Sequence, residues 1–276
     1  MKKFTIYQCI PSYKPAATAR IIQSILPFDC KILLDIEDSI QDIQFPAFTS
    51  QLKARAREYL IEIIQAIPGQ KFCVRINSLS GSEYGFDKEL IHTISNRIES
   101  VFLPKIETVS ELDRFYNDFG DRFKLNLIIE TQRGISNLDQ ILQSTHKSRI
   151  EHIFFGNYDF HLDTKTYPIK EQRSPQYWDV VRPIIAKAEA NGINFGNSPY
   201  VNIEDSYSLA FSLEQLMQLC SRPFAVMSLH KTQTQLLFWA QTKIDCQIST
   251  AGTGIHQPHT WYISQTKTQR QEFCGE

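Results

Sequence analysis

Residues 124–160 read KLNLIIETQRGISNLDQILQSTHKSRIEHIFFGNYDF, and this stretch decides the fold. It contains two short apolar runs, at residues 125–129 and 152–155, with about one helix of sequence between them. Apolar runs of this length, rich in β-branched and aromatic residues, are typical of strands buried on both faces of a parallel sheet. The strands of a strand–helix–strand unit run in the same direction, so their carboxyl ends lie at one edge of the sheet.

An acidic residue stands just past each of these runs, Glu130 after the first and Asp159 after the second. The strand arrangement places both carboxylates at the same edge, where they repel each other unless a positive charge lies between them. A hard divalent cation is the natural partner, and two carboxylates completed by water suit Mg²⁺. We therefore predict that Glu130 and Asp159 are ligands for Mg²⁺, with Mn²⁺ as the alternative ion. The other interpretation is that each residue caps the start of a helix.

The whole chain repeats this alternation of strand and helix. Eight strand-like runs and eight helical segments predict an α/β fold, a (β/α)8 TIM barrel in a single domain with a C-terminal extension. We place the barrel at residues 1–241 and a C-terminal lid or tail at residues 242–276. An open doubly wound sheet is the alternative, but it usually has a glycine-rich first turn, and the chain contains no G-x-G-x-x-G. The predicted strands are residues 4–10, 31–36, 72–76, 101–103, 125–129, 152–155, 193–195 and 224–229; the predicted helices are residues 16–26, 52–67, 86–98, 109–119, 135–142, 177–190, 203–219 and 232–241.

The composition excludes several classes of partner. The 276 residues include 29 lysines and arginines against 30 aspartates and glutamates, which does not point to nucleic acid or an anionic membrane surface. No apolar run approaches the ~18 residues of a membrane span, and residues 1–15 are a poor signal peptide, so we predict a cytoplasmic protein. Cys9, Cys30 and Cys73 lie in or beside apolar runs, which favours buried reduced thiols.

Polar and charged residues follow nearly every predicted strand. In a (β/α)8 barrel these positions form one mouth, where the chemistry of such barrels is sited. Arg75 has a forked guanidinium that fits the two oxygens of a substrate carboxylate. Backbone N–H groups of the turn at residues 156–158, at the amino end of a helix, could hold the same carboxylate. The predicted mouth includes Ser12, Glu37, Asp38, Arg75, Lys105, Glu130, Gly156, Asn157, Tyr158 and Asp159.

Two of the basic residues at the mouth also have structural interpretations. Arg75 could close an ion pair with Glu37 or Asp38 across adjacent strands. We expect Lys105 to pair with nearby carboxylates rather than form a Schiff base, because that chemistry needs a desolvated lysine and a charged rim does not provide one.

Six segments of the chain resemble, in order, the citrate lyase β-subunit-like enzymes, within the group that also includes the malyl-CoA and citramalyl-CoA lyases and the HpcH/HpaI-type aldolases. Any one segment is a weak signal, but the ordered set spans most of residues 4–235 and is specific. The segments are LLDIEDSI (33–40), VRINSL (74–79), FLPKIET (102–108), LIIETQRG (127–134), FFGNYDF (154–160) and, more loosely, SLHKTQ (228–233).

This resemblance implies a Mg²⁺-dependent barrel that makes or breaks a carbon–carbon bond next to a 2-oxo acid, often with an acyl thioester as the other half. Glu130 and Asp159 are then the metal ligands, and Arg75 is the catalytic guanidinium that grips the substrate carboxylate. Glu37 and Asp38 are then catalytic acids near the metal-bound waters. The substrate-binding residues are Ser12, Arg75, Lys105, Gly156, Asn157 and Tyr158. A 2-oxo acid suits such a site, because it chelates a divalent ion through its carboxylate and keto oxygens.

The sequence departs from the family pattern at three places. Thioester lyases of the family have a lid that ends in a G-x-M-I-D-x-P segment, whose Asp reaches a neighbouring subunit's site. The equivalent residues 250–269, TAGTGIHQPHTWYISQTKTQ, contain no acidic residue, and Ser264 stands near the position of that Asp. Asn202 stands where Asp is common, and Ser12 stands where a glycine would let an anion approach the backbone. These departures affect the thioester half of the site and leave the metal and 2-oxo acid half intact.

We therefore predict a Mg²⁺-dependent carbon–carbon lyase or aldolase that acts on a small 2-oxo or hydroxy carboxylic acid, either free or as an acyl thioester such as a CoA ester. Two other functions stay open: an acyl-thioester hydrolase or transferase on the same metal site, and a non-catalytic family member that binds a metabolite. Family members are commonly trimers, so the resemblance also implies a homo-oligomer.

Overall fold

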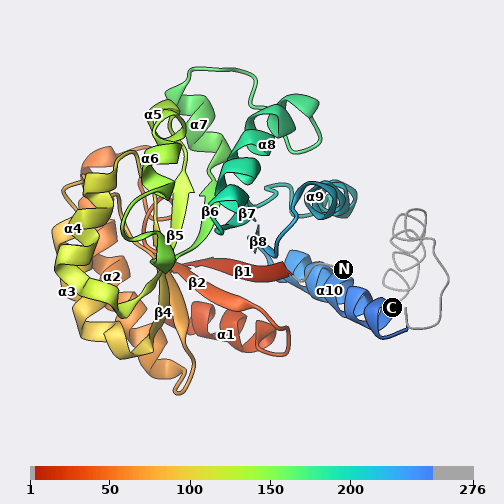
Figure 1. Ribbon diagram of the computed structural model, residues 1–276. Helices are drawn as coiled ribbons and strands as arrows, with labels where there is room; N and C mark the ends of the chain where they lie inside the picture. The colour runs from red at the N-terminus through yellow and green to blue at the C-terminus, as the bar shows by residue number, and fades with distance from the viewer. Residues whose placement is uncertain (1–3, 251–276) are drawn as a thin grey trace.

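The computed structural model describes the backbone of residues 4–250 and the side chains of residues 4–243. Eight parallel strands pair in chain order, and β1 closes the barrel against β8 (Figure 1). The predicted (β/α)8 TIM barrel is confirmed, and the open sheet is excluded. The strands are β1 (Phe4–Pro11), β2 (Lys31–Asp35), β3 (Phe72–Arg75), β4 (Ile98–Leu103), β5 (Lys124–Ile129), β6 (Ile150–Phe155), β7 (Asn194–Asn197) and β8 (Phe224–Ser228).

Helices surround the strands and connect each strand to the next (Figure 1). The α-helices are α1 (Pro15–Ile25), α2 (Thr49–Ala66), α3 (Tyr84–Ile94), α4 (Val109–Phe119), α5 (Gln132–Ser136), α6 (Leu138–Leu142), α7 (Asn157–Asp163), α8 (Pro175–Ala190), α9 (Ser206–Leu219) and α10 (Lys231–Thr250). Single-turn 3₁₀ helices occupy Pro46–Phe48, Ser95–Arg97, Gly120–Arg122 and Lys147–Arg149. None of the helices in residues 4–250 combines the length and hydropathy needed to cross a bilayer, and the cytoplasmic location stays a prediction.

The structure differs from the expected helices on both sides of β6. The single helix expected at residues 135–142 is two short helices, α5 and α6, that break at Asn137. The Asn137 side chain donates a hydrogen bond to the Glu107 carbonyl at 2.9 Å, so a contact with the β4–α4 connection holds this break. Helix α7 follows β6 directly, where the turn at residues 156–158 was expected to begin a helix, although no such helix was among the eight predicted ranges. The expected division at residue 241 falls inside α10 and stays a prediction. Of the expected lid or tail at residues 242–276, residues 251–276 lie outside the described residues.

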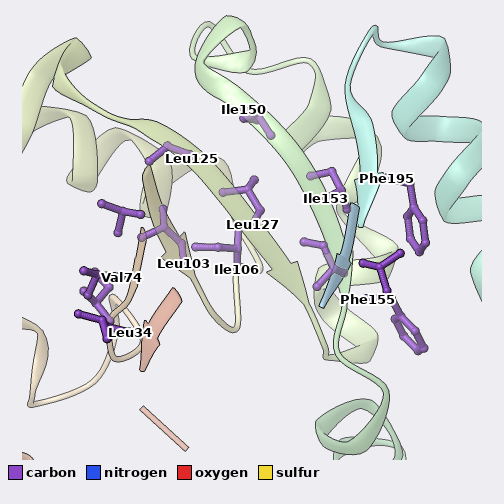
Figure 2. Close-up of a cluster of buried hydrophobic side chains, with 14 of the residues drawn as sticks. Leu34, Val74, Leu103, Ile106, Leu125, Leu127, Ile150, Ile153, Phe155 and Phe195 are labelled. Atoms are coloured by element: carbon purple, nitrogen blue, oxygen red, sulfur yellow. The ribbon is translucent and has the colours of Figure 1, made fainter. Parts of the chain in front are cut away.

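The strands bury both faces, as their continuous apolar runs predicted. In β5, Leu125, Leu127 and Ile129 point outward into the core between strands and helices, whereas Ile128 belongs to a separate cluster inside the barrel. Figure 2 shows the outer core, with Leu125, Leu127 and Phe155 among its labelled side chains. Full burial of each such side chain contributes about 1.5–3 kcal/mol. This packing fixes the strands, and the strands fix the positions of the residues at their ends.

The barrel interior also contains a chain of polar side chains from four neighbouring strands. Ser100 donates to the Cys73 thiol at 3.1 Å and accepts from the Asn126 amide at 3.0 Å, and the Asn126 carbonyl lies 2.9 Å from Nδ1 of His152. Burial lowers the pKa of His152 to about 3, so the ring is neutral. The expected buried, free thiols are confirmed for Cys9 and Cys73, whereas Cys30 is free and partly exposed.

Candidate active site

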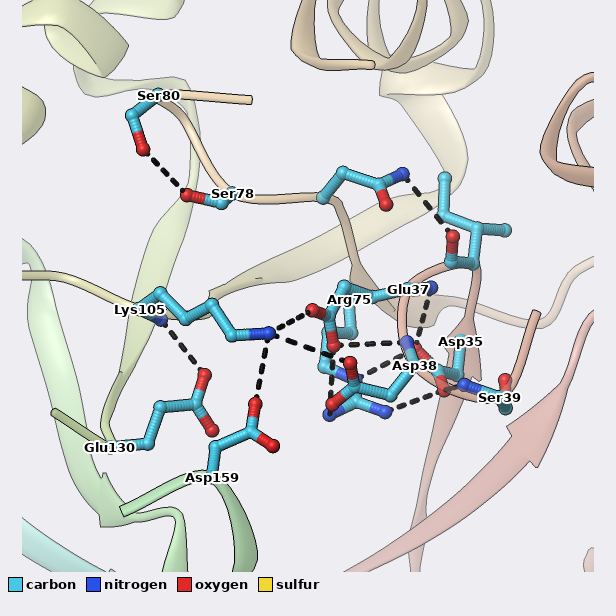
Figure 3. A network of polar contacts seen from close by, with 12 residues as sticks. Asp35, Glu37, Asp38, Ser39, Arg75, Ser78, Ser80, Lys105, Glu130 and Asp159 are labelled. Carbon is cyan, nitrogen blue, oxygen red and sulfur yellow. Dashed lines mark hydrogen bonds and ion pairs between the residues drawn. The ribbon is translucent and has the colours of Figure 1, made fainter. Parts of the chain in front are cut away.

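The candidate site lies at the carboxyl ends of β2 to β6 (Figure 3). Charged side chains from five neighbouring strand ends point toward one another there, and six of the predicted mouth residues belong to this group. The group is Asp35, Glu37, Asp38, Arg75, Lys105, Glu130 and Asp159.

Glu130 lies immediately after β5, and its side chain is nearly fully buried. One carboxylate oxygen accepts the backbone N–H of Lys105 at 2.9 Å. The other lies against Gly156: a Cβ on that glycine would sit 2.3 Å from Glu130 Oε2. Only glycine therefore leaves room for this carboxylate. Burial, reinforced by the negative charges of Glu37 and Asp159, raises the pKa of Glu130 well above its usual value.

Asp159 lies in the first turn of α7, and Figure 3 shows its carboxylate beside that of Glu130. Its Oδ2 atom is buried and has no hydrogen-bond partner of good geometry among the described residues, although the Lys105 ammonium approaches it to 2.9 Å as an ion pair. Neither acid is the N-cap residue of a described helix, although Asp159 lies in the first turn of α7, where a helix favours negative charge. Thr131 is the N-cap of α5, with its hydroxyl 3.0 Å from the Gly134 N–H, and α7 begins after Gly156 without a side-chain cap.

Lys105 reaches across the mouth from the end of β4. Its ammonium lies 3.0 Å from Glu37, 3.5 Å from Asp38 and 2.9 Å from Asp159. Burial alone would lower the pKa of Lys105, but these carboxylates, Glu37 foremost, raise it above its usual value. The ammonium is therefore charged at neutral pH, and the expected pairing with carboxylates is present.

Arg75, at the end of β3, forms a two-pronged ion pair with Asp35, a residue that sequence reasoning did not single out. Its Nε and Nη2 atoms lie 2.7 and 2.6 Å from the two Asp35 oxygens. The remaining Nη1 atom lies 3.3 Å from Glu37 and 3.4 Å from Asp38. Asp35 thus occupies the two guanidinium nitrogens Nε and Nη2 that could bind both oxygens of a substrate carboxylate. Only Nη1 remains directed toward Glu37 and Asp38.

Asp35 is fully buried at the end of β2 and organises the turn that follows. Besides Arg75, its oxygens accept the backbone N–H groups of Glu37 at 3.0 Å and Ser39 at 3.3 Å. Burial alone would raise the pKa of Asp35, but the Arg75 charge and these hydrogen bonds lower it below its usual value. The sequence signal for this role was present in LLDIEDSI, because Asp35 faces the barrel interior two residues after Leu33.

Glu37 is buried between Arg75 and Lys105, and it accepts the Asp38 N–H at 3.0 Å. Burial is the main reason why the pKa of Glu37 rises from 4.5 to about 7; the two cations oppose this rise, and the Asp38 charge adds to it. A carboxyl group with such a pKa exchanges a proton easily near neutral pH.

The raised pKa of Glu37 predicts a pH-dependent stability of the metal-free protein. The folded state binds the Glu37 proton more tightly than the unfolded state does. The contribution of Glu37 to the free energy of unfolding is therefore full below pH 4.5 and is lost as the pH rises to about 7. Glu37→Gln should therefore lose less stability than wild type between about pH 5 and about pH 8. Urea denaturation in EDTA measures this difference. Glu58→Gln, on the surface of α2, is the control, and parallel pH profiles for wild type and Glu37→Gln would contradict the assignment.

Three of the other predicted substrate-binding residues use their polar groups within the protein. The Gly156 N–H donates to the Ile129 carbonyl at 3.0 Å, and the Asn157 N–H donates to Ser198 Oγ at 3.4 Å. The Tyr158 hydroxyl lies 3.4 Å from Glu171. These contacts engage two of the three backbone N–H groups that we expected to hold a carboxylate.

Ser12 follows β1 and is fully buried. Its N–H donates to the Asp35 carbonyl at 2.9 Å, whereas its hydroxyl has no hydrogen-bond partner among the described residues. The hydroxyl is therefore available for a contact that the described part of the chain does not supply.

A model of the HpcH/HpaI aldolase/citrate lyase family matches residues 10–222 of the chain. The protein belongs to this family. Human mitochondrial citramalyl-CoA lyase is 27% identical over 220 residues, which cover 71% of this chain and 60% of that protein. The corresponding mouse protein is 24% identical over 216 residues, which cover 71% of this chain and 61% of that protein. The chain thus matches about 60% of the length of these curated relatives.

Solved structures with low sequence identity have the same fold. The Mycobacterium tuberculosis citrate lyase β subunit, complexed with oxaloacetate and magnesium, has a TM-score of 0.68 at 17% identity and covers 87% of this chain and 97% of its own. Protein CitE from the same organism, complexed with magnesium, acetoacetate and coenzyme A, has a TM-score of 0.69 at 15% identity. The match covers 94% of this chain and 91% of the CitE chain. The HpcH/HpaI assignment and the barrel therefore agree.

The acids of this HpcH/HpaI family member fit a divalent cation. Glu130 and Asp159 supply hard oxygen ligands, and the buried Asp159 oxygen lacks a well-aligned donor among the described residues. Gly156 clears the space that the Glu130 carboxylate occupies. Among the described residues, the site contains five carboxyl groups against two cationic side chains, and a dication would balance the negative charge of these acids when they are ionised.

Proposed function

We propose that the protein is a Mg²⁺-dependent carbon–carbon lyase or aldolase that acts on a small 2-oxo or hydroxy carboxylic acid. The observation that carries this proposal is the pair Glu130 and Asp159 at one end of the barrel, with Arg75 on the opposite side of the same acidic cluster. A divalent ion held by the two acids, with Mn²⁺ as the alternative to Mg²⁺, would polarise the keto or hydroxyl oxygen of the substrate and stabilise negative charge as the bond breaks.

Arg75 binds the substrate carboxylate through its Nη1 end in this proposal. Asp35 already occupies Nε and Nη2, so the guanidinium is fixed in orientation before the substrate arrives. A carboxylate at Nη1 would replace the long contacts to Glu37 and Asp38 at 3.3 and 3.4 Å. These contacts are weaker than a charge-assisted hydrogen bond of about 2.8 Å, so the exchange favours the substrate.

Glu37 and Asp38 are the proposed proton-transfer groups. Cleavage of a 2-hydroxy acid needs a base that removes the hydroxyl proton, so that the hydroxyl becomes the new carbonyl while the carbon–carbon bond breaks. The electron pair of that bond passes to the departing carbon as the enolate of its adjoining carbonyl group, and this carbon then takes up a proton from solvent. Glu37, whose pKa is about 7, can accept the hydroxyl proton near neutral pH. Asp38 is partly exposed and can pass the proton to solvent. The Ser12 hydroxyl, which has no hydrogen-bond partner in the described part of the chain, could make a further contact to the substrate.

The expected loss of activity in two ligand variants tests this function. The protein is incubated with Mg²⁺ and a panel of 2-hydroxy acids and their CoA thioesters, and release of pyruvate, oxaloacetate or glyoxylate is followed. Glu130→Gln and Asp159→Asn should each reduce activity by at least ~100-fold, because each leaves the polarising ion with one protein ligand. Asp139→Asn, a surface aspartate paired with Lys187, should keep wild-type activity. Wild-type turnover that is unchanged in EDTA would contradict the metal assignment.

The panel also distinguishes the alternatives. CoA dependence is a proposal, supported by the coenzyme A bound in the structural neighbour CitE, and the lid residues 250–269 without an acid are the reason to compare free acids with thioesters. Release of free CoA without a 2-oxo acid would indicate the hydrolase or transferase. Binding of oxaloacetate that is lost in Arg75→Ala, with no turnover of any compound, would indicate the non-catalytic binder. The homo-oligomer stays a prediction from the family resemblance.

A further inference from the structure

Lys105 is unlike the other cation of the site in having no dedicated partner. Arg75 is paired through two atoms with a fully buried Asp35. The Lys105 ammonium is instead shared among Glu37, Asp38 and Asp159, which come from two different strand ends, and its side chain is 35% exposed. A shared, partly exposed ammonium on a flexible stem can leave one of its partners without losing the others.

The backbone of Lys105 is held in a conformation that non-glycine residues rarely adopt, with φ of 54°. Such a conformation is strained and persists only where surrounding contacts compensate. Here the backbone N–H contacts Glu130 at 2.9 Å while the ammonium contacts Asp159 at 2.9 Å. One residue therefore touches both proposed metal ligands.

We propose that Lys105 is the internal counter-cation of the metal site, a positioning residue whose ammonium occupies Asp159 Oδ2 until a divalent ion displaces it toward Glu37 and Asp38. This inference rests on the proposed metal site. Without metal, the ammonium offsets the repulsion among the three carboxylates that it contacts. With metal, the same ammonium competes for one of the two ligands and adds repulsion between cations.

The proposal therefore gives Lys105 opposite effects on two measurable quantities. Removing its charge should destabilise the metal-free protein, because the carboxylates lose their counter-ion. Removing it should also strengthen Mg²⁺ binding, because Asp159 is freed and the ion meets a more negative site. A lysine that only maintained the shape of the mouth would weaken both stability and metal binding when it was replaced.

Lys105→Met tests the proposal, with Mg²⁺ alone as the probe. Isothermal titration calorimetry measures the Kd for Mg²⁺, and thermal unfolding in EDTA measures the Tm. We expect Lys105→Met to bind Mg²⁺ at least ~10-fold more tightly, because the ion then no longer competes with the ammonium for Asp159, and to have a lower Tm in EDTA. Lys88→Met is the matched control: Lys88 also has a 35% exposed side chain, but it pairs with Asp118 at the outer helices. It should leave the Kd unchanged.

Two further variants keep the result interpretable. Lys105→Gln removes the charge but keeps a polar end, and it replaces the methionine variant if that variant does not fold; Lys105→Arg should retain wild-type affinity for Mg²⁺. An unchanged or weaker affinity in the neutral variants, with normal Mg²⁺ binding by wild type, would overturn this inference alone. Absence of Mg²⁺ binding by wild type would overturn the proposed metal site together with it.

Discussion

Gly156→Ala is expected to abolish Mg²⁺ binding and to reduce catalytic activity by at least ~100-fold, although it adds only one methyl group. The new Cβ would lie 2.3 Å from Oε2 and 2.5 Å from Cβ of Glu130, far closer than carbon and oxygen atoms can approach. Glu130 is held by the Lys105 N–H on one side, and Gly156 is held by its own N–H to Ile129 on the other. The Glu130 carboxylate must therefore leave the position that it has beside Asp159 in the structure. Calorimetric titration with Mg²⁺ and the lyase assay measure the two effects.

Gly85→Ala is the matched control for this substitution. Gly85 lies near the start of α3, and a Cβ built there would have no neighbour within 4 Å. Alanine is also a better helix former than glycine, so this variant should be as stable as wild type or slightly more stable and should bind Mg²⁺ normally. Full Mg²⁺ affinity in Gly156→Ala, with the fold intact by circular dichroism, would show that Glu130 is not a ligand.

Asp35→Asn is expected to lower the free energy of unfolding by about 3–5 kcal/mol, because it leaves the Arg75 charge without its buried partner. The substitution keeps the shape of the side chain but replaces one acceptor of the Arg75 fork with an amide donor. It also weakens the turn that Asp35 holds through the N–H groups of Glu37 and Ser39. Urea denaturation at neutral pH measures the change.

Asp179→Asn provides the comparison for this loss. Asp179 pairs with Arg182 on the exposed surface of α8, and its removal should cost less than about 1 kcal/mol. The double variant Asp35→Asn with Arg75→Met should recover part of the lost stability, because the unpaired buried charge is then gone. A loss in Asp35→Asn no larger than in Asp179→Asn would mean that Arg75 finds another partner and that Asp35 does not orient it.

The strands could be predicted because each is a short, mostly apolar run that is buried on both faces. In β5, the change from Ile129 to Glu130 marks the carboxyl end of the strand in the sequence itself. The parallel arrangement then follows from the helical connection, so the rim position of Glu130 and Asp159 needs no information beyond the sequence.

The contacts that complete the site depend on strand register, which the sequence does not display. Asp35 meets Arg75 because these two residues are opposite each other in the β2–β3 pairing. Gly156 meets Glu130 because Ile129 pairs with Phe155, after a register shift earlier in the same ladder. The break between α5 and α6 depends in the same way on a contact across the molecule, from Asn137 to the Glu107 carbonyl.

The most direct test of the metal site is the position of Mn²⁺ in crystals of the wild-type protein, located by its anomalous scattering. We expect one strong peak between Glu130 and Asp159, within coordination distance of an oxygen from each, and no such peak at this position in crystals of Asp159→Asn. A peak elsewhere in the molecule, or none at this end of the barrel at saturating Mn²⁺, would contradict the account.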